Sequence, residues 1–449
     1  MRGLKQRALS AGRWSVFGFA ASQGIRLVTT LVMTRLLAPS MFGVMSIAVM
    51  VNVIASLLTD LGIRQNIVQS RRGADPMFLD TAWTVQIIRG FVIWALVLTI
   101  SAVLWLAGRL GHLSGDTVYA TPILPWVLAV SSFSVVIGGF QSTKGAVALR
   151  GLQQRSRLVQ IELIDQLSAF AVMVAIAYET RSIWSLVAGQ LVGAAMGAVL
   201  SHTALPGAAN RFAWDPSSLR EIVNFGKWIF ASSFVGVFAL YADRIVLGGL
   251  VTPSTLGQFA IAATLVGAFN GVFTRLYSTV LMPALSEIVR GDRSRLKEVF
   301  YRVRVPTDLM LLFCAGVLGA TGQLVVDVLY DRRYAEAGWM LQILAVSMIW
   351  VRLDATRQLY LALGRPKYTA FLNFARFGTV FVALFVGFHL DGIRGAIWGF
   401  ALHPIVIALL SYRFNAKVGV NDFGRDLGVL VALPLGFLVG WGLEWIVRR

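Results

Sequence analysis

The chain has 449 residues, of which 57% are hydrophobic and only 14% are charged, whereas about 25% of the residues of a soluble domain are charged. Its mean hydropathy of +0.72 excludes an ordinary soluble protein and indicates a membrane protein. The net charge of +18 would suggest nucleic-acid binding in a soluble chain, so the positions of the basic residues decide what that charge means.

Apolar stretches recur along the whole chain. A helix needs about 20 mostly apolar residues to cross about 30 Å of hydrocarbon, and it satisfies its own backbone hydrogen bonds. The basic N-terminus precedes a first span without a convincing cleavage site, so we expect a retained helix and not a signal peptide. We expect thirteen segments, at 14–34, 42–59, 83–107, 123–140, 163–178, 183–204, 228–248, 257–281, 307–329, 339–361, 371–388, 396–412 and 427–446.

The basic residues alternate between rich and poor connections. Most of the 40 Lys and Arg residues fall on every second connection, as the excess on cytoplasmic loops requires. The other connections hold only Arg35, Arg109, Arg181, Arg332, Arg333 and Arg394, with Arg448 and Arg449 added if the last segment crosses. This partition predicts a multi-pass protein of the bacterial inner membrane with a cytoplasmic N-terminus. The charge is topological, and we expect no nucleic-acid partner.

An internal repeat predicts the architecture. A shift of 214 residues places residues 35–43 (RLLAPSMFG) on residues 249–257 (GLVTPSTLG) without a gap. Six spans separate the copies, so both halves cross in the same direction and form a parallel repeat. We therefore expect an all-α polytopic membrane protein with two six-helix bundles, at 1–209 and 228–415. An amphipathic cytoplasmic linker at 210–227 joins them, and an additional hydrophobic segment follows at 416–449.

Three short motifs carry a family resemblance. They are residues 35–43 closing the first hairpin, residues 60–63 (DLGI) after the second span, and residues 243–248 (DRIVLG) ending the seventh. In this order and spacing the chain resembles, over nearly its whole length, the polysaccharide (Wzx-like, O-antigen and exopolysaccharide) flippases of the multidrug/oligosaccharidyl-lipid/polysaccharide exporter superfamily. Members usually have twelve or fourteen spans, so the odd thirteenth segment departs from the pattern.

The resemblance implies a function. It implies a transporter, not an enzyme, that moves an undecaprenyl-diphosphate-linked saccharide from the cytoplasmic to the periplasmic leaflet by alternating access. Such transport serves lipopolysaccharide, capsule or exopolysaccharide assembly, with membrane lipids around the protein and a polysaccharide polymerase and assembly proteins as further expected partners. The sequence does not distinguish these polymers, nor does it give a coupling ion or an oligomeric state.

Seven arginines lie inside expected spans, where a charge costs about 2.5–3.5 kcal/mol unless it faces a cavity or a partner. Arginine suits a diphosphate because its planar fork makes paired, charge-assisted hydrogen bonds. We expect substrate contacts at Arg26, Arg89, Arg244 and Arg275, with an ion pair as the alternative for Arg26 and snorkelling to headgroups for Arg89 and Arg275. Arg352, Arg357 and Arg376 complete the set, and the spacing of Asp354 and Arg357 permits a local ion pair.

The repeat relates Arg26 and Arg244. Under the shift they fall one helical turn apart in equivalent helices, which predicts a two-step ladder for a diphosphate. Asp243 is the competing partner of Arg244, but side chains of adjacent helix residues do not face one another, so we expect no pair between them.

Four carboxylates near or within spans are candidates for ion coupling, with an arginine partner or a helix cap as the alternative: Glu162, Asp165, Asp243 and Asp308. The four histidines lack metal-ligand spacing, so we expect no metal and no cofactor.

Other classes of membrane protein are less compatible with the chain. An integral glycosyltransferase or polymerase would need a large extramembrane loop or an acidic metal motif, and the sequence has neither. A multidrug exporter of the same superfamily should present carboxylates in its cavity, whereas the span inventory here is rich in arginine. A lipid II flippase, also cationic, stays open as an alternative, although the 35–43 hairpin favours the polysaccharide branch.

Overall fold

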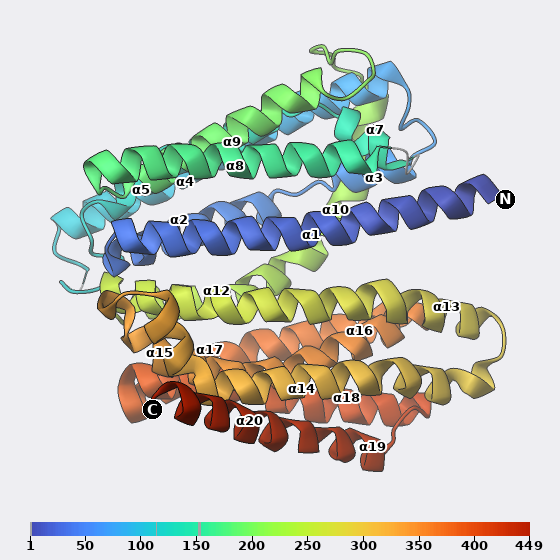
Figure 1. Ribbon diagram of the computed structural model, residues 1–449. Helices are drawn as coiled ribbons and strands as arrows, with labels where there is room; N and C mark the ends of the chain where they lie inside the picture. Colours follow the sequence, from blue (N-terminus) through green and yellow to red (C-terminus); the bar gives the residue numbers. More distant parts are fainter. Residues whose placement is uncertain (1, 114, 151–153) are drawn as a thin grey trace. The chain divides into compact units, whose positions relative to one another are not determined.

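The computed structural model describes the backbone of residues 2–113, 115–150 and 154–449, and the side chains of residues 13–113, 115–149, 154–226 and 236–449. The regular elements in this part of the chain are helices (Figure 1). Ten helical stretches there are long and apolar enough to cross a membrane. The expected all-α polytopic membrane fold is confirmed. The chain divides into two compact units, residues 1–237 and 238–449.

The N-terminal unit contains the first six expected spans. The segment expected at 123–140 is divided into two short helices at Ser132. Lys227 and Trp228, at the expected start of the second bundle, have side chains outside the described residues. The helices are α1 (Arg2–Leu36), α2 (Pro39–Leu58), α3 (Ile63–Gln69), α4 (Pro76–Arg109), α5 (Leu124–Ser131), α6 (Phe133–Gly139), α7 (Lys144–Arg150), α8 (Arg155–Thr180), α9 (Trp184–Thr203) and α10 (Pro216–Leu240).

Glycines bring α8 and α9 together. A Cβ atom added at Gly189 would lie 2.8 Å from the carbonyl oxygen of Ala169, and one added at Gly193 would lie 3.3 Å from that of Asp165. Without side chains at these positions, the two helices pack backbone to backbone, as small residues permit in membranes. The glycines of the ninth helix therefore have a packing role.

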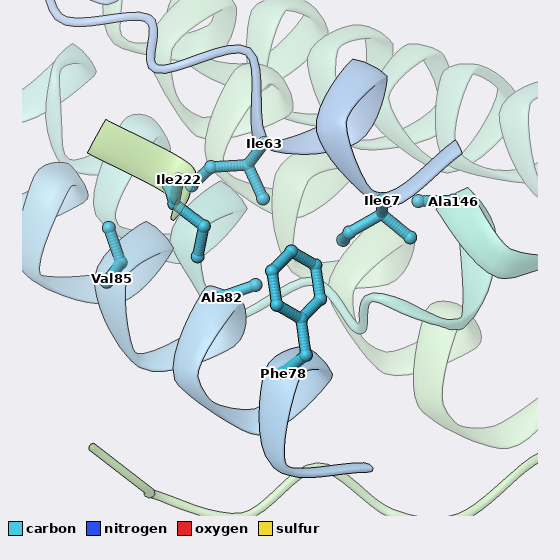
Figure 2. Close-up of a cluster of buried hydrophobic side chains, with 7 residues drawn as sticks. All are labelled: Ile63, Ile67, Phe78, Ala82, Val85, Ala146 and Ile222. Atoms are coloured by element: carbon cyan, nitrogen blue, oxygen red, sulfur yellow. The ribbon is translucent and has the colours of Figure 1, made fainter. Parts of the chain in front are cut away.

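The expected linker is the first part of α10, which continues without a break from Pro216 to Leu240. Ile222 of α10 is fully buried against Phe78 and other residues of α3, α4 and α7 (Figure 2). The adjacent Val223 is 44% exposed. This start of α10 is therefore held on the N-terminal unit by a narrow apolar stripe.

Polar contacts fix the first turn of α10. The Asp215 carboxylate accepts hydrogen bonds from the side chains of Ser217 and Ser218, and it lies 3.3 Å from the Arg72 guanidinium. These hydrogen bonds hold the pKa of Asp215 below its ordinary value. Asp215 therefore acts as an ionised helix cap.

The C-terminal unit contains longer and more irregular helices. Asp391 and Gly392 have non-helical backbone angles and kink α17 between the eleventh and twelfth expected spans. The helices are α11 (Ala242–Gly248), α12 (Pro253–Leu276), η1 (Tyr277–Leu281), α13 (Met282–Arg290), η2 (Arg293–Arg295), α14 (Leu296–Leu329), η3 (Arg332–Tyr334), α15 (Glu336–Ser347), η4 (Met348–Val351), α16 (Arg352–Ala362), α17 (Pro366–Leu402), α18 (Pro404–Val418), α19 (Phe423–Gly428), η5 (Val429–Val431) and α20 (Ala432–Val447).

The additional C-terminal segment forms α20, which lies along α14 (Figure 1). A Cβ atom added at Gly316 of α14 would overlap the carbonyl oxygen of Leu433, and one added at Gly436 would overlap that of Phe313. The stretch Phe423–Val447 is long and apolar enough to cross a membrane. The additional C-terminal segment therefore packs with its backbone directly against that of α14.

The two halves of the repeat begin corresponding helices in the same way. Both α2 and α12 start with a proline, at Pro39 and Pro253, and the residues before them, Ala38 and Thr252, have extended backbone angles. Proline is favoured in the first turn of a helix, where its missing N–H is not needed. The repeat seen in the sequence thus corresponds to a repeated helix start.

Candidate functional site

A cavity of about 400 Å³ lies inside the C-terminal unit. Its walls come from the end of α10 and from α11, α12, α15, η4, α16, α17 and α18. The volume is in the range of about 300–1,000 Å³ that is usual for small-molecule sites. The cavity therefore has room for a ligand the size of a sugar.

Two helix interruptions border the cavity. Tyr241 has non-helical backbone angles between α10 and α11, and the tighter turn η4 separates α15 from α16. Irregular backbone at membrane depth is tolerated where it lines a cavity or is buried in protein. Asp243 and Arg244 follow the first interruption, and Arg352 follows the second.

Two ion pairs lie on the cavity wall. Arg244 contacts Asp243 at 3.0 Å, and Arg357 contacts Asp354 at 3.3 Å. The expected pair of Asp354 and Arg357 is confirmed. The expectation that adjacent Asp243 and Arg244 do not pair is wrong, because the arginine is long enough to reach around the first turn of α11. Because Arg244 is paired, it is not the free charge that the two-step diphosphate ladder requires. A substrate contact at Arg244 stays a prediction.

A third arginine, Arg376 of α17, lines the same cavity. Its buried Nε atom has no hydrogen-bond partner among the described residues. His403 also faces the cavity, with Nδ1 lying 2.6 Å from the carbonyl oxygen of Phe400 and Nε2 lacking a partner in the described part of the chain. The cavity therefore combines an uncompensated guanidinium with neutral polar groups.

Asp308 belongs to a separate buried network. It lies 3.2 Å from Arg304 and 2.8 Å from Arg352, and it accepts a 2.5 Å hydrogen bond from Tyr277. Arg304 also contacts Asp426 at 3.0 Å. This network joins η1, α14, α16 and α19, which corresponds to the arginine-partner alternative for Asp308.

The two remaining candidates for ion coupling lie in the N-terminal unit. Glu162 and Asp165 of α8 line a pocket of about 360 Å³, together with Arg64 and Arg155. Arg155 donates a hydrogen bond to Ser15. The pocket thus has two basic and two acidic side chains. A role in ion coupling stays a prediction.

The other predicted substrate contacts differ in their surroundings. Arg26 is exposed on α1, and its side chain makes no hydrogen bond or ion pair with the described residues. Arg89 donates to Thr59 and to the carbonyl oxygen of Ser56 and lies 3.8 Å from Asp60, so it is held at the end of α2. Arg275 is half-buried in the last turn of α12. Their roles in binding stay predictions.

Comparison with known proteins assigns the family. Residues 32–338 match the family model described as "Polysaccharide biosynthesis protein". The chain belongs to the polysaccharide biosynthesis protein family. The family resemblance seen in the sequence is thereby confirmed.

Curated relatives of this family member carry related names. It is 22% identical to the lipopolysaccharide biosynthesis protein WzxC of Escherichia coli strain K12, over 96% of this chain and 85% of the relative. It is also 22% identical to the succinoglycan biosynthesis transport protein ExoT of Rhizobium meliloti strain 1021, over 74% of this chain and 65% of the relative.

Solved structures share the fold. The lipid II flippase MurJ, in an inward closed conformation, matches with a TM-score of 0.72 at 12% identity, covering 96% of this chain and 92% of MurJ. An inward-facing multidrug resistance transporter of the MATE family matches with a TM-score of 0.64 at 12% identity, covering 90% and 94%. At these identities the likeness concerns the fold alone.

Sequence reasoning did not assemble the cavity of this family member. The sequence pattern places Arg376 within a span without indicating a substrate contact, and it gives His403 no role. Asn270, Thr369 and Ser411, which also line the cavity, were not noticed. Polar residues within otherwise apolar spans were the available signal, because they usually face a partner or a cavity.

Proposed function

We propose that this member of the polysaccharide biosynthesis protein family flips an undecaprenyl-diphosphate-linked oligosaccharide across the bacterial inner membrane. The lipid moves from the cytoplasmic to the periplasmic leaflet by alternating access, for assembly of lipopolysaccharide, capsule or exopolysaccharide. Family membership, the names of WzxC and ExoT, and the fold shared with MurJ support the proposal. The protein acts as a transporter and not as an enzyme.

The observation that carries the proposal is the polar, arginine-lined cavity in a bundle of mostly apolar spans. A flipped lipid keeps its tail in hydrocarbon, but its hydrophilic head must cross the bilayer. Buried charges and unpaired polar groups are costly in a membrane, so their retention around a cavity indicates a polar ligand. Because the chain belongs to the polysaccharide biosynthesis protein family, we take this polar ligand to be the saccharide head of the lipid.

The diphosphate has its own proposed contacts. Arg26 is the foremost because it is exposed on α1, and Arg89, Arg244 and Arg275 are the others. The alternating distribution of basic residues supports a cytoplasmic N-terminus. A polymerase and assembly proteins would receive the saccharide on the periplasmic side.

A multidrug exporter of the same superfamily is the less favoured alternative. A cation substrate requires free carboxylates, whereas Asp243 and Asp354 each contact an arginine and a third arginine lines the same cavity. The excess of positive charge in the cavity would repel a cationic drug. A lipid II flippase stays open and is separated by the substrate tested.

Deletion of the gene tests the proposal in the native bacterium. We expect surface polysaccharide to be lost and the lipid-linked oligosaccharide to accumulate in the cytoplasmic leaflet, while peptidoglycan synthesis continues. Arg26→Ala should reproduce the loss at normal protein abundance. Continued flipping of the oligosaccharide in the deletion strain would contradict the proposal, and a selective arrest of peptidoglycan synthesis would favour lipid II.

A further inference from the structure

Six buried polar atoms around the cavity of the C-terminal unit have no hydrogen-bond partner among the described residues. They come from α11, α12, α17 and α18 and from the junction between α17 and α18, so segments far apart in the sequence place polar side chains around one space. The six atoms are Asp243 Oδ1, Asn270 Oδ1, Thr369 Oγ1, Arg376 Nε, His403 Nε2 and Ser411 Oγ. A buried polar atom without a partner costs about 1–3 kcal/mol, so a cluster of them indicates a ligand.

The six atoms include both hydrogen-bond acceptors and donors. The oxygens of Asp243 and Asn270 accept, and Nε2 of His403 also accepts when Nδ1 carries the proton given to Phe400. Nε of Arg376 donates, and the hydroxyls of Thr369 and Ser411 do both. A ligand that fits this set must donate hydrogen bonds to some atoms and accept them from others, as sugar hydroxyl groups do.

The charges of the cavity do not cancel. Arg244 is paired with Asp243 and Arg357 with Asp354, whereas Arg376 has no carboxylate partner among the described residues. The cavity is therefore lined by three guanidinium groups and only two carboxylates. A ligand with a single negative charge would neutralise the site.

We propose that this cavity binds one sugar residue that carries a carboxylate, a uronic acid or a similar acidic sugar, within the oligosaccharide. The proposal rests on the proposed flipping function and specifies its substrate class. The sugar carboxylate pairs with the Arg376 guanidinium, and the sugar hydroxyls donate to Asp243, Asn270 and His403. Trp350 and Phe400 also line the cavity and supply apolar surface.

The diphosphate of the lipid fits this cavity poorly. A fully ionised diphosphate only accepts hydrogen bonds, so it would leave the acceptors of Asn270 and His403 without donors. It would also be repelled by Asp243, whose side chain is only 4% exposed. A neutral sugar satisfies the acceptors but leaves Arg376 uncompensated. An acidic sugar answers both requirements.

Binding to the purified full-length protein in detergent tests the proposal. The probes are methyl glucuronide, methyl glucoside and inorganic diphosphate. We expect the glucuronide to bind about 10- to 100-fold more tightly than the glucoside, in line with one charge-assisted hydrogen-bonded contact. Arg376→Gln should remove this preference, and Arg376→Lys should keep part of it because the charge remains while the fork is lost.

The control is Arg394→Gln, which changes an exposed arginine on the same helix, α17. It should bind the glucuronide like the unaltered protein. Equal binding of glucuronide and glucoside to the unaltered protein would overturn the proposal, as would tighter binding of diphosphate that depends on Arg376. A folded Arg376→Lys protein keeps the test valid if Arg376→Gln is unstable.

Transport separates this proposal from the proposed function. In proteoliposomes the protein should flip a lipid-linked oligosaccharide containing an acidic sugar at least about 10-fold faster than its neutral counterpart. Arg376→Gln should lower the rate for the acidic substrate towards that for the neutral one. Equal rates for both substrates would refute the acidic-sugar site while flipping stands. Failure to flip either one would refute the function itself.

Discussion

Two charged regions of the C-terminal unit differ in how completely their groups are paired. In the network around Asp308, all four carboxylate oxygens of Asp308 and Asp426 contact an arginine or a tyrosine. In the cavity, six polar atoms lack partners in the described part of the chain, and one arginine lacks a carboxylate. The carboxylates of the Asp308 network are fully paired and stabilise the fold, although Nε of Arg304 lacks a hydrogen-bond partner among the described residues. The unpaired groups of the cavity come from several helices and are available for a ligand.

We expect the largest loss of stability from a substitution at Asp308. Asp308→Asn leaves Arg304 and Arg352 without their shared buried carboxylate, and breaking a buried pair in this way costs about 3–5 kcal/mol. We expect little folded protein in the membrane, measured by abundance and by thermal unfolding in detergent. Glu298→Gln is the control, since its pair with Arg302 is exposed and contributes about 0–1 kcal/mol. Normal abundance of Asp308→Asn would remove the contrast between the two regions.

A smaller effect is expected at the ion pair of the cavity. Arg244→Ala leaves the buried Asp243 carboxylate without its partner, so abundance should fall severalfold and transport should fall with it. Arg244→Lys should retain a fraction of both. The double variant Asp243→Asn with Arg244→Gln should recover abundance but not transport, because the groups that face the ligand are altered. Full transport by the double variant would show that the pair is structural only.

The smallest effect concerns helix packing away from both regions. Gly436→Ala places a methyl group against the carbonyl oxygen of Phe313 in α14, and such overpacking costs about 1–3 kcal/mol. Gly442→Ala is on the same helix, and its added Cβ meets no described heavy atom within 4 Å. We expect a lower unfolding temperature for the first variant only. Equal unfolding temperatures would show that α20 can shift on α14.

The sequence predicted the features that depend on local pattern. Apolar runs of sufficient length marked the spans, and the match of Pro39 with Pro253 marked two helix starts that the structure shares. The pairing of Asp354 with Arg357 followed from helical spacing. These features need only neighbouring residues.

The sequence could not predict what several helices build together. Asn270, Arg376 and His403 lie in segments with no fixed spacing between them, so nothing in the chain indicated that they share one cavity. The rule that adjacent helix residues do not face one another failed at Asp243 and Arg244, where a helix interruption and a long side chain bring the charges together. Interior geometry, and not periodicity, decides both cases.

The most direct test fills the cavity without removing any polar group. Gly267 of α12 lines the cavity, and a Cβ atom added there meets no described heavy atom within 4 Å, so Gly267→Phe should project a ring into the space. Gly378→Phe on α17 is the control, because its Cβ is equally free and it does not line the cavity. The measurement is flipping of a lipid-linked oligosaccharide in proteoliposomes at equal protein content. We expect Gly267→Phe to abolish flipping and Gly378→Phe to preserve it, whereas undiminished flipping by a folded Gly267→Phe protein would contradict a ligand-binding role of the cavity.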